Sequence, residues 1–469
     1  MHRKLLGVAA AVAAALALAA PAGAADWTAG APGAGDPFFP LQGNGGYDAR
    51  HYSLELDYDP VTQQLDGSAA ITIVPTQDLD QFNLDLRDWF AVTRVAVGKH
   101  DAGYLQQDGQ ELVVTPRPKL HEGRTYTVYV DYNGVPETVV DPDESFEGWV
   151  KNSDGAFVVN EPQGAPGWFP ANDDPNDKAT YDFAITVPEG KVAIGNGRLL
   201  SSVTEGGKTI WRWHEDSPMA SYLTTATNGD FDFTVQTGPN GLPIYNAIDS
   251  DGFTAAQKAT AALRFAAQPE IISFFSELYG PYPFTSAGAV IDRGGVFYAL
   301  ESQTKPMYDG VPSENTVVHE LAHQWYGDSV TLSVWRDIWL NEGFARFSEW
   351  IFREKVRQTT TAQQLFNAAY ARPAGDPAWQ IPPALIPGPA NLFSPSFPSY
   401  DRGAMTLQAL RVKIGDERFF SFMRAWYAEN RDSNATTEDL IALAEREAGQ
   451  QLDEFFNVWL YQPAKPTSW

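Results

Sequence analysis

The spacing of apolar residues changes once along this chain, and the change divides it into two regions. From about residue 48 to 235, apolar residues alternate with polar ones, as in Leu54, Leu56 and Tyr58. A period of two is typical of strands that bury one face. From about residue 254 onward the period becomes 3.6, which is typical of amphipathic helices. The pattern predicts a β domain followed by a mainly helical domain.

Residues 26–238 are accordingly predicted as an N-terminal antiparallel β domain, and residues 239–469 as the second domain. Turn residues such as Asp66-Gly67 and Asn133-Gly134 separate the alternating runs of the first domain. A chain of 469 residues exceeds what one ordinary core organises, which also favours two domains. The boundary is placed at the turn-rich residues 238–241.

Helix ends in the second region are indicated by capping residues and prolines. Thr436 with Asp439 predicts the start of a late helix, and Gly449 predicts its end. Eight prolines between residues 373 and 398 exclude regular helix or central strand there, so a long irregular loop is expected. The other predicted helices span residues 254–279, 313–326 and 337–356.

The first 25 residues have the pattern of a cleavable secretory signal peptide. Basic residues precede an apolar run over residues 5–20, and Ala22 and Ala24 supply the small residues of a cleavage site. The run is short for a bilayer span, which disfavours a membrane anchor. The mature protein is therefore expected to be secreted, extracellular and free of the membrane.

Charge and cysteine usage exclude several functional classes. The formal net charge is −26, and such an excess of acids repels a phosphate backbone, so no nucleic-acid partner is expected. The chain has no cysteine, which excludes disulfides, thiolate nucleophiles and thiolate metal ligands. No obligate protein partner is indicated.

One short segment carries the strongest chemical signal: His319-Glu320-Leu321-Ala322-His323, inside a predicted helix. Histidines four positions apart lie one helical turn apart on the same face. That spacing allows both imidazoles to bind one zinc ion, while Glu320 acts on the water that the ion activates. With only seven histidines in the chain, an accidental pair of this kind is improbable.

Catalytic zinc sites use three protein ligands and leave a further position for water. No third histidine is near and cysteine is absent, so a carboxylate has to complete the set. Glu342, nineteen positions after His323 on the next predicted helix, is the candidate. An antiparallel helix pair would bring it beside the two histidines. Asp337 is a candidate to orient a ligand, or alternatively a helix N-cap.

These motifs resemble the aminopeptidase N family of zinc peptidases, in which HExxH is followed after eighteen residues by the glutamate of a WLNEGFA-like segment. The resemblance extends to Asn160-Glu161-Pro162, to residues 177–181 and to Tyr400-Asp401-Arg402-Gly403. It implies a saddle-like β domain followed by a thermolysin-like catalytic domain. The chain is similar to a short form of the family, without its large C-terminal helical domain.

The resemblance also implies roles for individual residues. His319, His323 and Glu342 would ligate one Zn²⁺, Glu320 would be the general base, and Tyr400 would donate a hydrogen bond to the oxyanion. Glu301 and Glu161 would bind the free α-amino group of a peptide substrate, which distinguishes an aminopeptidase from an endopeptidase. Ala299, two positions before Glu301, is expected to contact the substrate as well.

The sequence departs from the family at several of these positions. The exopeptidase segment reads Tyr298-Ala299-Leu300-Glu301-Ser302, where the family has Gly-x-Met-Glu-Asn. Arg402 stands in place of the usual Lys, and Asp328 in place of the usual Asn. Glu301 itself is retained, so amine recognition is expected. Tyr298 is expected either to change how the substrate backbone lies along the edge strand or to change the first subsite.

The function predicted from these observations is a secreted zinc aminopeptidase, a metalloprotease and hydrolase acting on peptides with a free N-terminus. A thermolysin-type zinc endopeptidase uses the same chemistry, and a catalytically inactive peptide-binding relative is a further alternative. Epoxide hydrolysis, found among the leukotriene hydrolase relatives of the family, is another. The intact set of ligands, base and tyrosine argues against an inactive binder.

Overall fold

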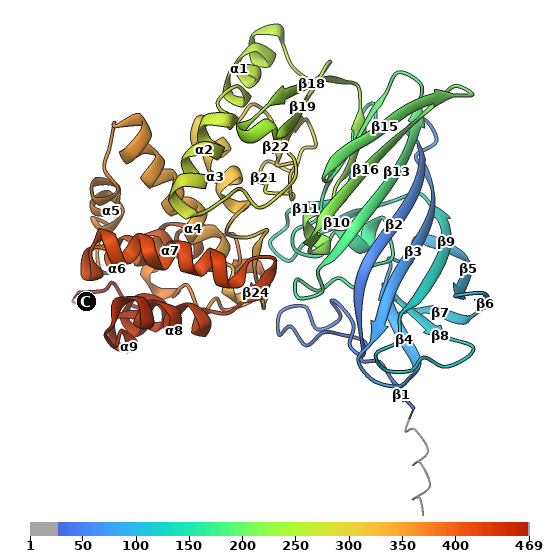
Figure 1. Ribbon diagram of the computed structural model, residues 1–469, viewed down its shortest axis with the longest axis horizontal. Coiled ribbons are helices and arrows are strands. Elements are labelled where there is room, and N and C mark those ends of the chain that lie inside the picture. Colours follow the sequence, from blue (N-terminus) through green and yellow to red (C-terminus); the bar gives the residue numbers. More distant parts are fainter. Residues whose placement is uncertain (1–26, 468–469) are drawn as a thin grey trace, which may run out of the picture.

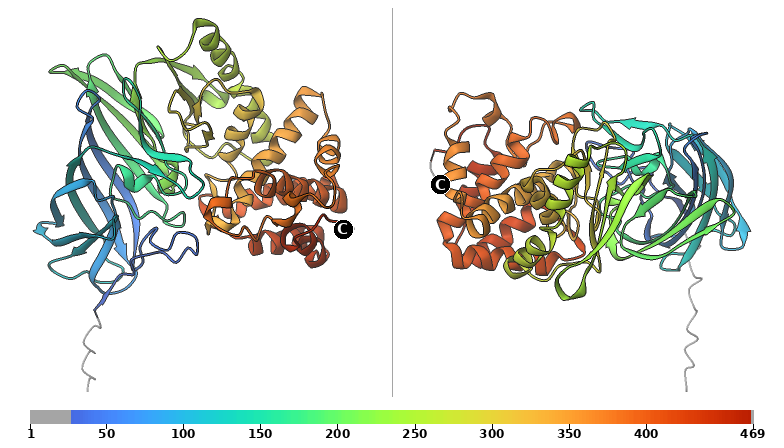
Figure 2. Two further views of the ribbon diagram at one scale, coloured as in Figure 1. Left: turned by 180° about the vertical axis from the view of Figure 1, so that it is seen from behind. Right: turned by 90° about the horizontal axis from the view of Figure 1, so that it is seen from above.

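The computed structural model describes residues 27–467, and its strands and helices are segregated into two halves that lie side by side (Figures 1 and 2). The first half consists of β-sheets and the second mainly of helices, which confirms the predicted fold class. The predicted signal peptide, residues 1–25, lies outside the described residues. Within those residues, no helix combines the length and the apolar character needed to cross a membrane.

The largest sheet forms the outer wall of the first half. Alternation places Leu54, Leu56 and Tyr58 on its buried face, as their spacing predicts. One neighbouring pair, β2 and β13, runs parallel, with Leu54 opposite Phe183, so the sheet is not wholly antiparallel. Its strands in spatial order are β15 (Arg198–Glu205), β16 (Lys208–Met219), β13 (Ala179–Pro188), β2 (Tyr47–Asp59), β3 (Gln64–Pro75), β9 (Tyr126–Gly134), β5 (Phe90–Val97) and β6 (His100–Asp101).

Two smaller sheets pack on the same core. Trp149 and Trp168 are fully buried in it, with ring centroids 6.1 Å apart. The four-stranded sheet contains β1 (Thr28–Ala29), β4 (Leu79–Asp85), β8 (Glu111–Thr115) and β7 (Gly103–Gln107). The five-stranded sheet contains β10 (Thr138–Val140), β11 (Phe146–Lys151), β12 (Ala156–Val159), β17 (Ala226–Gly229) and β14 (Val192–Gly195).

A fourth sheet opens the second half, and its edge strand faces the cleft described below. The predicted boundary at residues 238–241 falls in the turn of its first hairpin, so sheet membership assigns β18 to the second half. The edge strand β21 pairs only with β22 and leaves its other side free for an extended peptide. The strands in order are β18 (Phe231–Thr237), β19 (Pro243–Asp249), β20 (Ala287–Asp292), β22 (Met307–Asp309) and β21 (Ala299–Leu300).

Helices fill the rest of the second half. The single helix predicted over residues 254–279 is in fact two, because Pro269 begins a new helix instead of continuing the old one. The late helix begins and ends as predicted, with a capping box between Thr436 and Asp439 and with Gly449 at a φ of 64°. The helices are α1 (Ala255–Phe265), α2 (Gln268–Tyr279), α3 (Glu314–His323), α4 (Trp339–Phe352), α5 (Ala362–Tyr370), α6 (Gly403–Ile414), α7 (Asp416–Asn430), α8 (Thr437–Ala448) and α9 (Asp453–Phe456).

The proline-rich segment is irregular, as predicted, and ends in a wide helical turn, η8 (Phe397–Arg402), that leads into α6. The fully buried Arg402 holds it in place. Its guanidinium donates hydrogen bonds to the backbone carbonyls of Trp379, Val458, Trp459 and Gln462. Lysine, with one nitrogen on a flexible stem, could not make this fork of bonds. Arg402 thus ties the proline-rich segment and the chain end to the turn that carries Tyr400.

Candidate active site

Helix α3 places two histidines on a buried face. Its N-cap is Ser313, whose hydroxyl accepts a hydrogen bond from the amide of Thr316 at 3.1 Å. The helix ends at His323, three residues before its predicted end, and the turn that follows contains Gly327, whose φ of 140° disfavours a larger residue. His319 and His323 lie one turn apart with ring centroids 4.7 Å apart, as the four-residue spacing predicts.

Helix α4 packs against α3 and brings Glu342 to both rings. One carboxylate oxygen, Oε2, lies 3.0 Å from Nε2 of His319 and 3.5 Å from Nε2 of His323. All three potential ligand atoms are buried and lie within 4.8 Å of one another. The structure therefore brings together the three residues that the sequence predicts as metal ligands.

The outer nitrogens of both rings are held by acceptors. Nδ1 of His319 lies 2.8 Å from a carboxylate oxygen of Glu349, and Nδ1 of His323 lies 3.1 Å from the carbonyl oxygen of Tyr326. These contacts assign the proton to Nδ1 and turn each Nε2 toward Glu342. Sequence reasoning proposed Asp337 for this role, and that is wrong, since its carboxylate accepts bonds from the amide and hydroxyl of Thr437.

Glu349 was missed at the sequence level, although a signal exists. It follows Glu342 by seven positions, which is two helical turns and the same face of α4. A glutamate seven positions after Glu342 therefore lies on the side of the helix that is predicted to face the two histidines. Reading the stripe of α4 outward from Glu342 would have found it.

The donor set fits a zinc ion. Two neutral imidazole nitrogens and one carboxylate oxygen are the ligands of many catalytic zinc sites, and no thiolate is needed. The surrounding charges also call for a cation. Without one, burial raises the pKa of Glu320 to about 8, while the pKa of Glu342, despite the same burial, is held well below its usual value by His323 and His319. A bound cation would stabilise all these carboxylates in ionised form.

Glu320 and Tyr400 line the same cavity as the histidines. Carboxylate and ring atoms of Glu301, Glu320 and His323 lie within 4.8 Å of one another. The ring of Tyr400 stacks on that of His319, with centroids 5.9 Å apart and planes 17° apart. Burial raises the pKa of Tyr400 well above its usual value, so its hydroxyl stays protonated and able to donate a hydrogen bond.

Glu161 and Glu301 come from different halves of the molecule and meet beside Glu342. Glu161 follows β12 of the first half, and Glu301 follows β21 of the second. Oxygens of Glu161, Glu301 and Glu342 lie within 4.8 Å of one another. Oε1 of Glu161 and Oε1 of Glu301 are buried without a hydrogen-bond partner in residues 27–467. Burial raises the pKa of both carboxyls, and a cationic group placed beside them would stabilise their ionised forms.

The cavity encloses about 360 Å³ between α3, α4 and the edge strand. Ala299 lines it on β21, as predicted for a substrate-binding position. Tyr298, where the family has glycine, also lines it, and its hydroxyl donates to the carbonyl of Phe146 at 2.7 Å. The lining residues are Tyr298, Ala299, Glu301, Ser313, Asn315, Thr316, His319, Glu320, His323, Glu342, Arg346, Glu349, Arg353 and Tyr400.

Asp328 stands where the family has asparagine, in the loop after α3. It is fully buried, and neither carboxylate oxygen has a hydrogen-bond partner in the described part of the chain. Its carbonyl accepts a bond from Nζ of Lys178, which also donates to the carbonyls of Ser329 and Ser433. Lys178 thus ties the start of β13 to the loop that follows the histidine helix.

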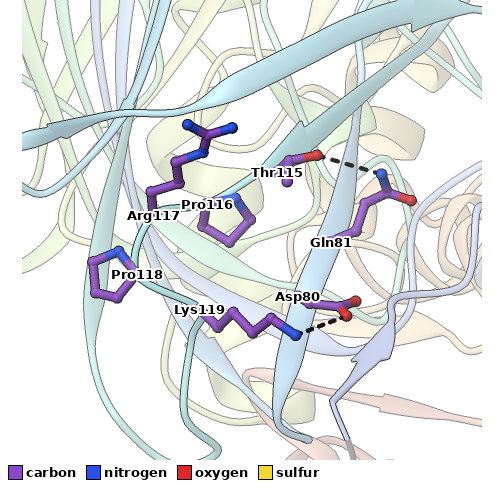
Figure 3. Close-up of a pocket in the computed structure, with 7 residues that line it drawn as sticks. All are labelled: Asp80, Gln81, Thr115, Pro116, Arg117, Pro118 and Lys119. Carbon is purple, nitrogen blue, oxygen red and sulfur yellow. Dashed lines mark hydrogen bonds and ion pairs between the residues drawn. The ribbon is translucent and has the colours of Figure 1, made fainter.

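A second concavity, of about 500 Å³, lies on the first half, next to β4 and β8 (Figure 3). Its polar groups pair with one another. Nζ of Lys119 lies 3.1 Å from the Asp80 carboxylate, and Gln81 donates to the hydroxyl of Thr115 at 3.4 Å. The lining contains no histidine and no buried carboxylate, so it supplies neither metal ligands nor an acid–base pair.

Comparison with known proteins agrees with both halves. Residues 48–223 match a family model described as the peptidase M1 N-terminal domain, and residues 290–459 match the peptidase family M1 domain. Similar curated proteins include aminopeptidase N of Lactococcus lactis subsp. lactis, 24% identical over 89% of this chain and 51% of that protein. Aminopeptidase M1-B of Oryza sativa subsp. japonica is 29% identical over 64% of this chain and 36% of its own length. The chain thus spans about half the length, or less, of these relatives.

Solved structures agree over nearly the whole chain. The crystal structure of an M1 zinc metallopeptidase from Deinococcus radiodurans is 27% identical, with a TM-score of 0.83. The match covers 93% of this chain and 100% of that one. A mutant of that metallopeptidase bound to a Tyr-Ser-Ala substrate matches with a TM-score of 0.81 at 27% identity, over 93% of this chain and 99% of its own.

Proposed function

Because the chain belongs to the M1 family of peptidases, we propose that it is a secreted zinc aminopeptidase that removes N-terminal residues from peptides. One observation carries the proposal. Glu161 and Glu301 each have a buried carboxylate oxygen that accepts no hydrogen bond from residues 27–467, and both carboxylates lie within 4.8 Å of Glu342, which itself faces both histidines. A buried pair of acids beside a hydrolytic metal site selects substrates with a cationic end.

His319, His323 and Glu342 would hold the zinc ion. When bound, zinc supplies a Lewis acid that activates water and polarises a carbonyl. Glu349 and the carbonyl of Tyr326 keep the two imidazoles in the tautomer that leaves Nε2 available. All three ligand residues are largely buried but line the cavity, where water and substrate can reach them.

Glu320 is proposed as the general base. Its carboxylate takes a proton from the attacking water and delivers it to the nitrogen of the leaving amine. Tyr400, protonated at neutral pH, donates a hydrogen bond to the oxygen that becomes negative as the carbonyl carbon turns tetrahedral. Its stacking on His319 keeps the hydroxyl close to the metal ligands.

Glu161 and Glu301 are proposed to bind the α-ammonium group, and the free edge of β21 at Ala299 to bind the substrate backbone. The two acids close the inner end of the cavity, so the scissile bond has to be the first peptide bond. In an endopeptidase, the substrate chain continues past this point, but here the two carboxylates occupy that space. Aminopeptidase activity in similar proteins and the Tyr-Ser-Ala ligand of the Deinococcus radiodurans structure support peptides as the substrates.

The signal-peptide pattern of residues 1–25 supports export to the extracellular space. The acidic composition is compatible with a protein that works in solution, away from anionic surfaces.

A panel of amino-acid arylamides with N-acetylated counterparts tests the proposal, before and after removal and return of zinc. We expect zinc-dependent cleavage of the free-amine forms alone. Cleavage of acetylated or internal bonds would assign an endopeptidase instead. Absence of all cleavage in protein that retains zinc would favour the inactive peptide-binding relative.

A further inference from the structure

Three elements line the active-site cavity: β21 and α3 run toward its inner end and α4 runs away from it, and the charges along them change sign. Glu301 follows the end of β21, and His323 and Glu342 stand beside it, so this inner end is acidic. The outer end lies near Tyr298 on the strand side, the first residues of α3 and the last residues of α4. Arg353, at the end of α4, lines the cavity there.

Arg353 is positioned but not neutralised. Its Nε donates a hydrogen bond to Oδ1 of Asn315 at 2.9 Å, which fixes the plane of the guanidinium. Its two terminal nitrogens make no hydrogen bond to residues 27–467, and no carboxylate oxygen of those residues lies within 4.0 Å. A guanidinium held in this way offers two parallel N–H groups, the geometry that matches a carboxylate.

Arg346, seven positions or about two helical turns before Arg353, shows the contrast. It pairs with Glu349 at 3.0 Å and with Asp401 at 3.5 Å, and its guanidinium lies 5.7 Å from the centre of the Tyr400 ring. Its charge is therefore already compensated by the protein. Of the two arginines that line the cavity, Arg353 is the one whose charge is available to a ligand.

The separation suits short peptides. Arg353 follows Glu342 by eleven positions, about 16 Å along a helix. An extended peptide advances about 3.4 Å per residue, so about five residues would span that distance. Helical side chains lean toward the N-terminal end, here toward Glu342, so fewer are needed. Two to four residues beyond the scissile bond bring a C-terminal carboxylate to the guanidinium.

From this arrangement we infer that Arg353, oriented by Asn315, binds a carboxylate on the leaving-group side of the substrate, so that the enzyme prefers short peptides with two free ends. The inference rests on the proposed aminopeptidase function and adds a specificity determinant to it. The carboxylate is the free C-terminus or an acidic side chain at a similar distance. A peptide that is cationic at its first residue and anionic at its last matches both ends of the cavity.

The test is a matched series of tripeptides to pentapeptides, each as the free acid and as the C-terminal amide. All share the first residue that the arylamide panel finds best. We expect kcat/KM for the free acid to exceed that of the amide by about tenfold or more at the favoured length, the effect of one charge-assisted hydrogen bond. A third series uses C-terminal amides with aspartate in the last position. If these amides are cleaved as efficiently as the free acids, a side-chain carboxylate can replace the C-terminal one.

Variants identify the residue responsible. In R353M the acid-to-amide ratio should fall to near one, and in R353K it should take an intermediate value, because lysine keeps the charge but not the fork. The ratio compares two substrates of one preparation, so a partly unfolded variant still reports it correctly. K355M is the matched control, because it removes the same charge from the same helical turn. Lys355 is exposed and does not line the cavity. The ratio of K355M should equal that of the wild type.

A wild-type ratio near one at every length overturns the inference, and so does an R353M variant that keeps the wild-type ratio. Arylamides have no carboxylate beyond the scissile bond, so their hydrolysis separates the two levels of the argument. If arylamides are cleaved in a zinc-dependent way but free-acid peptides are not preferred over their amides, only the proposed role of Arg353 is removed. No cleavage of arylamides or peptides removes the proposed function itself.

Discussion

Buried carboxylates occur in both halves of the molecule, but their surroundings differ. In the β half, Asp173 accepts hydrogen bonds from Ser221 and Gln42, and Asp177 accepts them from the amide of Ala49 and from Asn172. Four other acids of the β half keep one buried oxygen unpaired, but the second oxygen of each accepts a hydrogen bond; they are Asp85, Glu111, Asp141 and Glu147. In the cleft, neither carboxylate oxygen of Glu161 or of Glu301 accepts a hydrogen bond from residues 27–467, although Oε1 of Glu301 lies 3.9 Å from Nδ1 of His323. Folding alone disfavours such groups, since desolvation is not offset. The difference separates acids that hold the fold from acids that await a ligand.

The strongest test of this division is E320Q. Glu320 is a cleft acid with no hydrogen bond to the described residues, so its loss should leave the stability of the zinc-free protein unchanged or slightly higher. Turnover should fall about 10²- to 10⁴-fold, the usual contribution of a general base. The measurements are kcat, chemical unfolding and zinc content by elemental analysis. Near-normal kcat in zinc-loaded E320Q would remove Glu320 from the chemistry.

Y400F extends the comparison to a neutral cleft group. The hydroxyl is the only part removed, while the stacking on His319 remains. If that hydroxyl stabilises the oxyanion, kcat should fall about 10²- to 10³-fold with little change in KM. Steady-state kinetics on one arylamide decides this. A change confined to KM would assign Tyr400 to substrate binding.

E301Q probes the ligand-binding acids directly. Removal of one charge from the amine site should raise KM for free-amine substrates by about 10- to 100-fold, because one charge-assisted hydrogen bond is lost. The zinc-free protein should be no less stable than the wild type. The ratio of rates on free and N-acetylated substrates gives the selectivity, and an unchanged ratio would show that Glu301 does not recognise the amine.

D177N is the counterpart in the β half and should have the smallest effect. Asn172 cannot turn its amide round, because its oxygen accepts a bond from the amide of Asn44 at 2.6 Å. The new side-chain amide has to turn its oxygen toward Asn172, so its NH₂ group replaces the oxygen that accepts the bond from the amide of Ala49 at 2.9 Å, at a cost of about 1 kcal/mol in the free energy of unfolding. Denaturant titration measures this. If D177N lost amine selectivity while its stability stayed intact, Asp177 would act in substrate binding, and the division into structural and ligand-binding acids would be wrong.

Local patterns predicted much of this molecule from sequence. The four-residue spacing of His319 and His323 determines their geometry within one helix, and alternation determines which strand residues are buried. Capping residues likewise mark helix ends, as Thr436 and Gly449 do. These relations hold within a few residues, where the backbone alone sets the distances.

Relations across the chain were harder to predict. The parallel pairing of β2 with β13 joins segments about 130 positions apart, and no local spacing announces it. Helical spacing places Glu349 on the same face as Glu342, but its contact with Nδ1 of His319 depends on how α4 packs against α3. The burial of Arg402 and the free guanidinium of Arg353 depend on which partners packing happens to bring near. Each is a consequence of tertiary contacts, not of residue type.

The two acids of the amine site belong to different halves, and Lys178 fastens those halves together beside the histidine helix. The metal ligands, by contrast, all lie on α3 and α4 of one half. Substrate selection and bond cleavage therefore have different mechanical requirements. Loosening the junction between the halves, for example by mild denaturant or by K178M, would free Glu161 from Glu301 while leaving the hydrolytic centre assembled. Such an enzyme would still hydrolyse peptide bonds, but it would no longer be restricted to the first bond of the chain.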